Sequence, residues 1–459
     1  MVTISRRGGV RVGLAVAVAV AGARVASRPT LVPWPARVRP AFIAVTTLVS
    51  ATVAYVAAGS LGIRGGGLPS LGQRARRAVV ASAAGAGLLG TYRIAKHQAG
   101  ARLEGAGREI EPGFSIPPTL HTVSGGPGSH VDFATVGREG ARFVGSSVPA
   151  DVVEQVTGSM PRMEAIRVFV GVDSAATAEE RVALALEELR RTAAYDRSVL
   201  LIGSPAGSGY ANPTPVDVVE ILTLGDCASV AVGYGLLPSF LSLDRVGLAG
   251  HTQSLLLEAI ATDLIGRAHR PRLVLYGESL GARVQQRALP AGTVDLDRLG
   301  VHAALWVGTP GGSESVDFHA AVAAESITVD RPDQVPATLP VPRPRVWFLE
   351  HDGDPVVRFE PTVMYRRPFW LGVPPRGRNV PQGMVWAPGI TWAQVLVDTL
   401  FATHIVPGNF ESRGHDYRAD LGGIVPAAFG FAIDSATTQR LESALRQLEV
   451  TRAQRVDEA

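Results

Sequence analysis

A serine flanked by glycines lies in the middle of the chain, in LVLYGESLGARV (Leu273–Val284), which fits the pattern G-x-S-x-G. An apolar run precedes it and a helical pattern follows, so the serine is expected on a sharp turn between strand and helix. Such a turn needs glycine two positions to either side, where backbones come close. We predict that Ser279 is a nucleophile and that the Leu280 N–H, at the start of the helix, donates to a developing oxyanion. A serine that only caps the helix is the alternative.

An acid that orients the base is expected further along the chain. A serine nucleophile needs a base, and the base needs an acid; with this turn the chain order is serine, acid, histidine. Residues 345–355, RVWFLEHDGDP, predict a strand that ends in an acidic turn. Asp354, beside Pro355, is the first choice and Asp352 the second. Aspartate beside glycine and proline is also typical of ordinary turns, which is the alternative.

His415 is the predicted base, because it lies on a polar loop, ESRGHDYRAD, after all the predicted strands. An exposed loop histidine is the alternative interpretation. The other histidines after the serine either precede the acid or end an apolar helical stretch: His302, His319, His351 and His404.

A second oxyanion donor is expected in the glycine-rich loop after the strand at 198–205. Pro205 has no N–H, so the donor is predicted to be Ala206 or Gly207. The glycines of this loop allow its backbone to approach a substrate closely.

Strand-like and helix-like patterns alternate from residue 166 onwards. The expected strands are Ile166–Val172, Ser198–Pro205, Ala228–Tyr234, Arg272–Tyr276, His302–Gly308 and Arg345–Glu350. Thr177–Glu180, TAEE, predicts a capping box, and helices are expected at 250–268 and 280–289. This alternation predicts an α/β fold with a mostly parallel sheet and helices on both faces.

The first hundred residues are apolar and rich in arginine. Ala41–Ile63 contains 23 residues without a charge, enough for a helix to cross a hydrocarbon core of about 30 Å. Weaker apolar stretches lie at Val10–Ala26 and Ala78–Tyr92. A cleaved signal peptide is the alternative for the first of them.

These patterns predict three regions. Residues 1–96 are expected to form a transmembrane helical region of two or three spans, and residues 97–130, rich in Gly, Pro and Ser, a linker. Residues 131–459 are expected to form the catalytic domain. We therefore predict a multi-pass protein of the cell membrane.

The composition narrows the chemistry. The chain is 46% hydrophobic and 19% charged with a mean hydropathy of +0.18, and its formal charge of +3 gives no reason to expect nucleic-acid binding. Lys96 is the only lysine, which excludes a serine–lysine dyad downstream of it. Cys227 is the only cysteine, which excludes an intrachain disulfide and a cysteine-rich metal site.

Over residues 120–430 the chain resembles an actinobacterial membrane-anchored α/β-hydrolase family, in which a hydrophobic N-terminal domain precedes an α/β-hydrolase fold. The resemblance rests on GREGARFV, IRVFVGVDSA, GSGYANP, GDCASVAVGYGLLPSF, GESLG, HDGDPVVRFEP and GHDY, which follow one another in family order. It implies Ser279 as nucleophile, Asp354 as acid and His415 as base. The chain departs from the family in a shorter N-terminal region and in VGYGLLPSF, which lacks a Gln and a Trp.

The predicted function is a membrane-anchored serine hydrolase that cleaves a carboxylic ester or thioester, with a small-molecule or lipid acyl substrate and no cofactor or metal. An acyltransferase with the same triad and a non-catalytic membrane scaffold are the alternatives. A metal-dependent hydrolase using His351, Asp352, Asp354 and His404 lacks the usual ligand spacing. The aromatic residues between acid and base are expected to line an acyl pocket, to lie at a lipid interface, or to pack in the core: Tyr365, Phe369, Trp370, Trp386 and Trp392.

Overall fold

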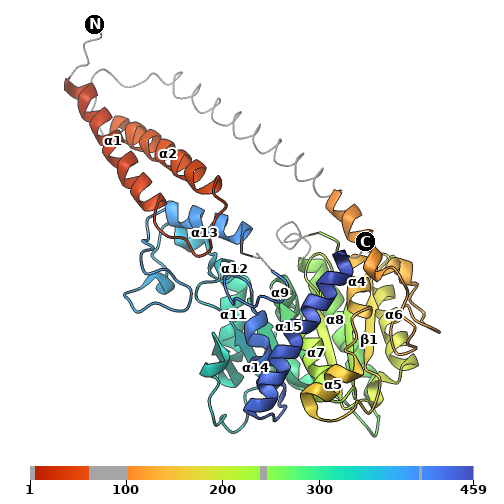
Figure 1. Ribbon diagram of the computed structural model, residues 1–459. Helices are drawn as coiled ribbons and strands as arrows, with labels where there is room; N and C mark the ends of the chain where they lie inside the picture. The colour runs from red at the N-terminus through yellow and green to blue at the C-terminus, as the bar shows by residue number, and fades with distance from the viewer. Residues whose placement is uncertain (1–5, 61–101, 238–245, 403–405, 458–459) are drawn as a thin grey trace. The chain divides into compact units, whose positions relative to one another are not determined.

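The chain divides into two compact units in a computed structural model that describes residues 6–60, 102–237, 246–402 and 406–457 (Figure 1). One unit comprises Met1–Ala99 and Phe359–Ala402, and the other comprises Gly100–Arg358 and Thr403–Ala459. The domain predicted over 131–459 is therefore interrupted, because residues 359–402 group with the N-terminal residues and not with the sheet.

The second unit contains a parallel sheet of seven strands in the order β1-β3-β2-β4-β5-β7-β6. The strands are β1 (Ile166–Val170), β2 (Val199–Ser204), β3 (Cys227–Val232), β4 (Arg272–Glu278), β5 (Val301–Val307), β6 (Ser326–Val329) and β7 (Val346–Leu349). The central strands are buried along their length, as apolar strands covered on both faces must be. Six of the strands were predicted within a few residues; β6, a short edge strand, was not.

Helices cover both faces of this sheet. On one face α6 (Ala178–Arg191), α8 (Val246–Asp263) and α9 (Leu280–Arg287) pack side by side; on the other lie α7 (Pro213–Leu222), α14 (Arg418–Phe429) and α15 (Ser435–Asp457). The change of face follows from right-handed crossovers, because β1 to β2 runs in one direction across the sheet and β2 to β3 runs back. Further helices of this unit are α4 (Gly137–Val144), α5 (Ala150–Thr157), α10 (Thr293–Arg298), α11 (Ser313–Val322) and α12 (Pro355–Arg358).

A local signal in the sequence explains one feature of this unit, and tertiary contacts override a local signal in another. The capping box predicted at Thr177–Glu180 is present, with both reciprocal hydrogen bonds at the start of α6. In the described part of the segment predicted as a linker, 97–130, residues 102–108 are helical, and Val123 is buried and bridges to Arg167 of β1. Backbone pairing with the sheet outweighs the Gly- and Pro-rich composition of this segment.

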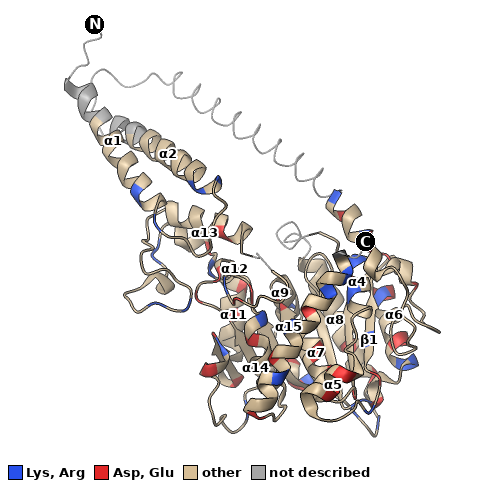
Figure 2. Cartoon of the chain, in the orientation of Figure 1, with Lys and Arg blue, Asp and Glu red and all other residues tan. Residues whose placement is uncertain are grey.

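The N-terminal unit contains α1 (Arg6–Ala26), α2 (Val38–Ser60) and α13 (Ile390–Leu400). Figure 2 shows few charged residues along the described part of α1 and α2. Asp398 of α13 accepts hydrogen bonds from the Trp34 Nε1–H (2.5 Å) and the Leu31 N–H (3.1 Å), which ties the loop between α1 and α2 to α13. Burial, which outweighs these bonds, raises the pKa of Asp398 to about 7.

A small apolar core holds this unit together. It consists of Leu31, Trp370, Leu371, Val380, Met384 and Val395. Of the aromatic residues between the predicted acid and base, Trp370 therefore packs in a core, whereas Tyr365 and Phe369 are exposed.

The predicted membrane spans find no support in the described residues. In residues 6–60, 102–237, 246–402 and 406–457, no helix is both long enough and apolar enough to cross a membrane. Helices α1 and α2 do form where the first two apolar stretches were predicted, and the third stretch, Ala78–Tyr92, lies outside the described residues.

Candidate active site

Ser279 lies on the turn that joins β4 to α9, with φ 55° and ψ −126°. A positive φ in a non-glycine residue costs about 1–3 kcal/mol and persists only where the surroundings impose it. Here the Ser279 N–H donates to the Val307 carbonyl of the neighbouring strand β5 at 2.9 Å. The predicted strand–turn–helix context of this serine is therefore present.

The two glycines of the motif are required by close backbone contacts. A Cβ at Gly277 would lie 2.7 Å from the Ala282 Cα, and a Cβ at Gly281 would lie 2.2 Å from the Ser204 carbonyl oxygen at the end of β2. Any side chain at either position would force the turn apart. The spacing in G-x-S-x-G thus reflects the approach of α9 to its own turn and to β2.

Asp354 follows β7 on a short turn and is fully buried. Its Oδ1 accepts the Val356 N–H at 2.8 Å, and its Oδ2 is 2.6 Å from the His415 Nδ1. Asp352, the second choice, instead accepts a hydrogen bond from Arg358 at 2.8 Å. Of the two aspartates, Asp354 is the one that contacts the predicted base.

His415 lies on the loop before α14 and is buried against the end of β5. At that end Gly308 has φ 56°, and a Cβ there would lie 2.7 Å from both the His415 Cε1 and the Tyr417 Cε2. The absence of a side chain at Gly308 therefore makes the space in which the imidazole lies.

Ser279 and His415 line the same cavity, of about 330 Å³. The His415 Nε2 is buried there without a hydrogen-bond partner, and no hydrogen bond joins it to Ser279 within the part of the chain that the structure describes. In enzymes without substrate such bonds are often long and shorten only when substrate binds. The arrangement presents a hydroxyl and an unpartnered imidazole nitrogen to one enclosed space.

The electrostatics of the site favour a protonated His415. Burial lowers the pKa of this histidine, but the charge of Asp354 and its hydrogen bond, with further contributions from Glu278 and Asp416, raise it above the ordinary 6.5. An imidazolium formed at this position is therefore stabilised by its surroundings.

The other histidines after the serine lie in different surroundings. The His319 Nε2 is 3.4 Å from Glu350, and the His351 Nε2 is 2.9 Å from Asp420. His302 is exposed at the start of β5, and His404 lies outside the described residues.

Tyr417 is a residue of the site to which the sequence had assigned no role. Its O–H donates to the Asp354 Oδ2 at 2.6 Å, and its oxygen accepts the His351 N–H at 3.2 Å. Burial, together with the charge of Asp354, raises the pKa of Tyr417 well above 10, so it stays a donor. Its place in GHDY, two residues after the base, was the available signal.

Leu280 and the loop after β2 were predicted to supply the oxyanion donors. Leu280 is the first residue of α9, so its N–H has no partner within the helix. The Ala206 N–H already donates to the Tyr210 carbonyl at 2.8 Å. Of the two alternatives in that loop, Gly207 is the one whose N–H makes no backbone hydrogen bond to another described residue.

Acidic residues surround the serine but are held by neighbours. Glu278, next to Ser279, accepts hydrogen bonds from Asn212 at 2.6 Å and from the Tyr276 O–H at 2.7 Å. Burial and the Glu278 charge raise the pKa of Tyr276 well above 10. Asp416 is paired with Arg418 at 2.7 Å.

Three residues of the alternative metal site belong to three separate pairs, and the fourth, His404, lies outside the described residues. His351 contacts Asp420, Asp352 contacts Arg358, and Asp354 contacts His415. Across the described ranges, no group of three or more His, Cys, Asp or Glu side chains is arranged to hold a metal ion.

The fold and the site define a class of protein: a parallel α/β sheet that presents a serine on a strained turn after its central strand, and a histidine–aspartate pair after later strands. A family model of the alpha/beta-hydrolase family matches residues 166–429, more than half of the chain, and the chain belongs to this family. Comparison with curated proteins and with solved structures gave no match. The membrane-anchored, actinobacterial group within the family stays a prediction from sequence.

Proposed function

We propose that this protein is a serine hydrolase that cleaves a carboxylic ester or thioester through an acyl-enzyme. The observation that carries the proposal is the state of the two ring nitrogens of His415. The Nδ1 is hydrogen-bonded to Asp354, and the Nε2 has no partner in the cavity that Ser279 also lines. A scaffold without chemistry has no need of a strained serine or of a buried imidazole beside it.

The proposed reaction has two halves. His415 takes the proton of the Ser279 Oγ as that oxygen bonds to the acyl carbon, and then gives the proton to the departing alcohol or thiol. In the second half His415 takes a proton from a water that attacks the acyl carbon, and returns it to the Ser279 Oγ as the bond from that oxygen to the acyl carbon breaks and the acid leaves. Asp354 stabilises the imidazolium, and the N–H groups of Leu280 and Gly207, or of Ala206 if its bond to Tyr210 opens, hold the oxyanion.

A lipid acyl chain is the substrate that the neighbouring walls favour. A second cavity, of about 340 Å³, shares Glu139, Phe143, Tyr210 and Ala211 with the first. It continues along Phe114, Pro213 and Val456, with Arg142, Glu449 and Arg452 also in its walls. Apolar and aromatic walls that lead away from the serine suit a hydrocarbon chain. An acyltransferase would use the same residues with an alcohol or amine in place of water.

We also propose that the protein works at the cell membrane. Large apolar side chains are exposed on both N-terminal helices, among them Val16 (57%), Leu48 (69%) and Val53 (61%). Many large apolar side chains exposed on neighbouring helices are typical of contact with a lipid or protein partner. The measurement is the distribution of the full chain between membrane and soluble fractions after carbonate extraction.

The first experiment is labelling of the full chain with a fluorophosphonate probe. Wild type is expected to be labelled, and Ser279→Ala and His415→Ala are expected to lose the label. Ser159→Ala and His251→Ala, at exposed positions away from the cavity, are the matched controls and are expected to keep it. A correctly folded wild type that is not labelled would favour the scaffold.

The hydrolase and the acyltransferase differ in product. Incubation of the enzyme with a p-nitrophenyl ester and increasing glycerol is expected to yield free acid throughout. An acyl glycerol that replaces the acid as the main product would favour the transferase.

A further inference from the structure

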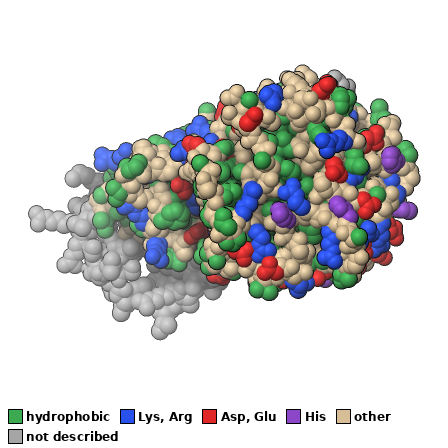
Figure 3. All heavy atoms as spheres, turned by 90° about the horizontal axis from the view of Figure 1, so that it is seen from below, with side chains coloured by type: hydrophobic (Ala, Val, Ile, Leu, Met, Phe, Trp, Pro, Cys, Tyr) green, Lys and Arg blue, Asp and Glu red, His purple; other side chains and the backbone are tan. Residues whose placement is uncertain are grey.

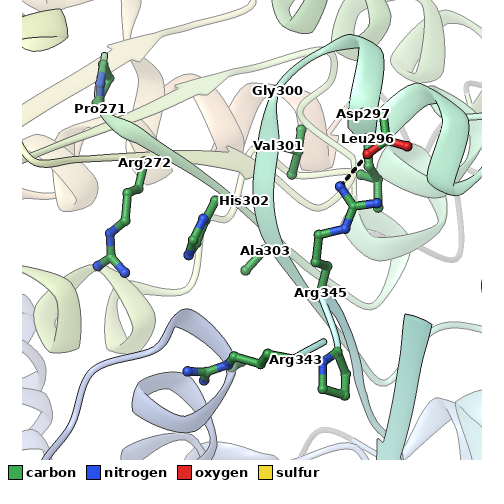
Figure 4. Close-up of a pocket in the computed structure, with 12 residues that line it drawn as sticks. Pro271, Arg272, Leu296, Asp297, Gly300, Val301, His302, Ala303, Arg343 and Arg345 are labelled. Carbon is green, nitrogen blue, oxygen red and sulfur yellow. Dashed lines mark hydrogen bonds and ion pairs between the residues drawn. The ribbon is translucent and has the colours of Figure 1, made fainter. Parts of the chain in front are cut away.

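A third cavity of the sheet unit, of about 530 Å³, lies at the amino ends of strands β4, β5 and β7. Ser279 follows β4 and Asp354 follows β7, so this cavity is at the opposite end of the strands from the candidate active site. Its walls include Pro271, Arg272, His302, Arg343, Pro344 and Arg345. Figure 4 shows Arg272, His302 and Arg343 extending into the same opening from three adjacent strand starts.

The chain builds these walls with one motif used twice. Arg-Pro-Arg stands immediately before the apolar part of β4 (Arg270–Arg272) and again before β7 (Arg343–Arg345). In the sheet β5 lies between β4 and β7, so the two motifs flank the start of β5. Each proline fixes its own backbone angle, which limits how far the neighbouring arginines move.

A β-bulge places His302 between the two motifs. Leu273 of β4 pairs with Val301 of β5, but the next residue, Val274, pairs with Ala303. His302 is therefore the extra residue, and it is exposed in a strand that is otherwise buried. Bulges redirect a side chain in this way and are common beside functional sites.

Two arginines of the cavity have no carboxylate partner among the residues that the structure describes. Arg272 donates to the Phe429 carbonyl at 3.1 Å, and Arg343 donates to the Ala427 carbonyl. A Cβ at Gly430 would lie 2.9 Å from the Arg343 Nη1 and 3.6 Å from the Arg272 Nη1, so both guanidinium groups lie against one glycine. Two like charges are thus brought together at the C-terminal end of α14.

The third arginine, Arg345, lies between two carboxylates, so this group of three side chains carries a net charge of about −1 and adds no positive charge to the cavity. Arg345 pairs with Asp297 at 2.7 Å and with Glu325 at 2.6 Å. The net positive charge of the cavity therefore comes from Arg272 and Arg343. Burial lowers the pKa of His302, and the three arginines lower it further, which is the effect expected of a positive field. Seen from below, the molecule shows arginine and histidine side chains close together near the middle of its surface (Figure 3).

We propose that this cavity binds a dianionic phosphate group between Arg272, Arg343 and His302. A guanidinium group presents paired donors that match phosphate oxygens, and two of them supply the charge that a dianion requires. The cavity is larger than a bare phosphate needs, so it has room for an organic group attached to the phosphate, between Pro271, Val301 and Ala428. Capping of α14 by the arginines alone would leave the bulge at His302 and the open space without a role.

The test is isothermal titration calorimetry of the full chain with inorganic phosphate and with glycerol 3-phosphate, at constant ionic strength. Saturable binding with one site per chain is expected, and Arg272→Gln or Arg343→Gln is expected to raise the Kd about tenfold or more. Arg270→Gln is the matched control, because Arg270 belongs to the same motif but is exposed and does not line the cavity. Tighter binding of glycerol 3-phosphate would assign the site to an organic phosphate, and equal binding would assign it to phosphate itself.

Two outcomes would overturn the proposal. One is no saturable binding of either probe by wild type; the other is that Arg270→Gln weakens binding as much as Arg272→Gln, which would show only a general effect of charge. Because both cavity arginines also bond α14, the folding of each variant is checked by near-ultraviolet circular dichroism. If these variants do not fold, His302→Gln, on an exposed side chain, replaces them and is expected to weaken binding about threefold.

Discussion

The two ends of strands β4, β5 and β7 carry side chains of opposite character. At the carboxyl ends, Ser279, Asp354 and His415 are half or fully buried, and the aspartate is satisfied by three hydrogen bonds. At the amino ends, Arg272 is partly exposed and Arg343 is exposed; both donate to backbone carbonyls of α14, and the Arg272 guanidinium also lies over the Phe431 ring. The contrast shows that one sheet can carry a buried, hydrogen-bonded group of side chains at the carboxyl ends of its strands and an open, charged group at the amino ends.

The largest effect on kcat/KM is expected from a change at Asp354, the acid that holds His415 in place. Asp354→Asn should lower kcat/KM for a p-nitrophenyl ester about 10⁴-fold, because an amide neither stabilises the imidazolium nor holds the correct tautomer. Asp352→Asn is the control and should change it less than about threefold, because it breaks only a partly exposed ion pair with Arg358. Equal losses in both variants would mean that the observed pairing is not the one used in catalysis.

The pH dependence of the reaction should report the charge around His415. The imidazole must be neutral to accept the serine proton, so kcat/KM should fall about tenfold per pH unit below the pKa of His415. Because Asp354 raises that pKa, the fall should begin above pH 6.5. Rates measured from pH 5 to pH 9 would contradict this if the acid limb lay below 6.5.

The packing of the turn should be visible in stability. Gly281→Ala should lower the free energy of unfolding by about 1–3 kcal/mol, because the new methyl group meets the Ser204 carbonyl. Gly247→Ala, in a helix with nothing within 4 Å, is the control and should raise it by up to about 1 kcal/mol. Urea unfolding followed by circular dichroism measures both. Similar values for the two variants would show that the close approach at the turn is not tight.

Tyr417 should act by positioning the acid. Tyr417→Phe removes a hydrogen bond to a carboxylate worth about 1.5 kcal/mol, so kcat/KM should fall about tenfold. The less stabilised carboxylate should raise the pKa of His415, so the acid limb should move to higher pH. Tyr195→Phe, which loses a similar bond to Asp263 elsewhere in the unit, should leave the profile unchanged. An unmoved acid limb in Tyr417→Phe would leave this residue with a packing role only.

The smallest effect is expected when the amino end is changed and the carboxyl end is assayed. β4 has seven residues and separates the two ends by about 20 Å, so Arg272→Gln should keep kcat/KM within about twofold of wild type. The rate is measured with and without glycerol 3-phosphate. A rate that responds to this compound in wild type but not in Arg272→Gln would show that binding at the amino ends of the strands changes the reaction at the carboxyl ends.

Much of the candidate site could be predicted because its parts are marked locally. The turn at Ser279 is marked by the five-residue motif G-x-S-x-G. Asp354 and His415 were predicted from their order in the chain and from their positions on loops after strands. The role of Tyr417 and the engagement of the Ala206 N–H depend on contacts that only the folded chain makes. Local patterns report turns and strand ends well, but they do not report which donor is already used.

The fold shows the same limit. Six of the seven strands of the sheet are apolar enough to be recognised. The seventh, β6 (SITV), is short and half exposed at the edge of the sheet. The packing of residues 110–130 on β1 and the grouping of 359–402 with the N-terminal residues depend on contacts distant in sequence. The paired Arg-Pro-Arg motifs are visible in the sequence, but only the strand order brings them together.

Gly308 gives this chain a diagnostic position for comparative genetics. Because the His415 imidazole occupies the space that a side chain at 308 would fill, we expect a relative with another residue there to hold its histidine differently, even if serine, aspartate and histidine are all retained. A survey that scores only those three residues would count such a copy as an enzyme. The residue at position 308 is therefore expected to distinguish relatives that keep the geometry of the site from relatives that keep only the fold.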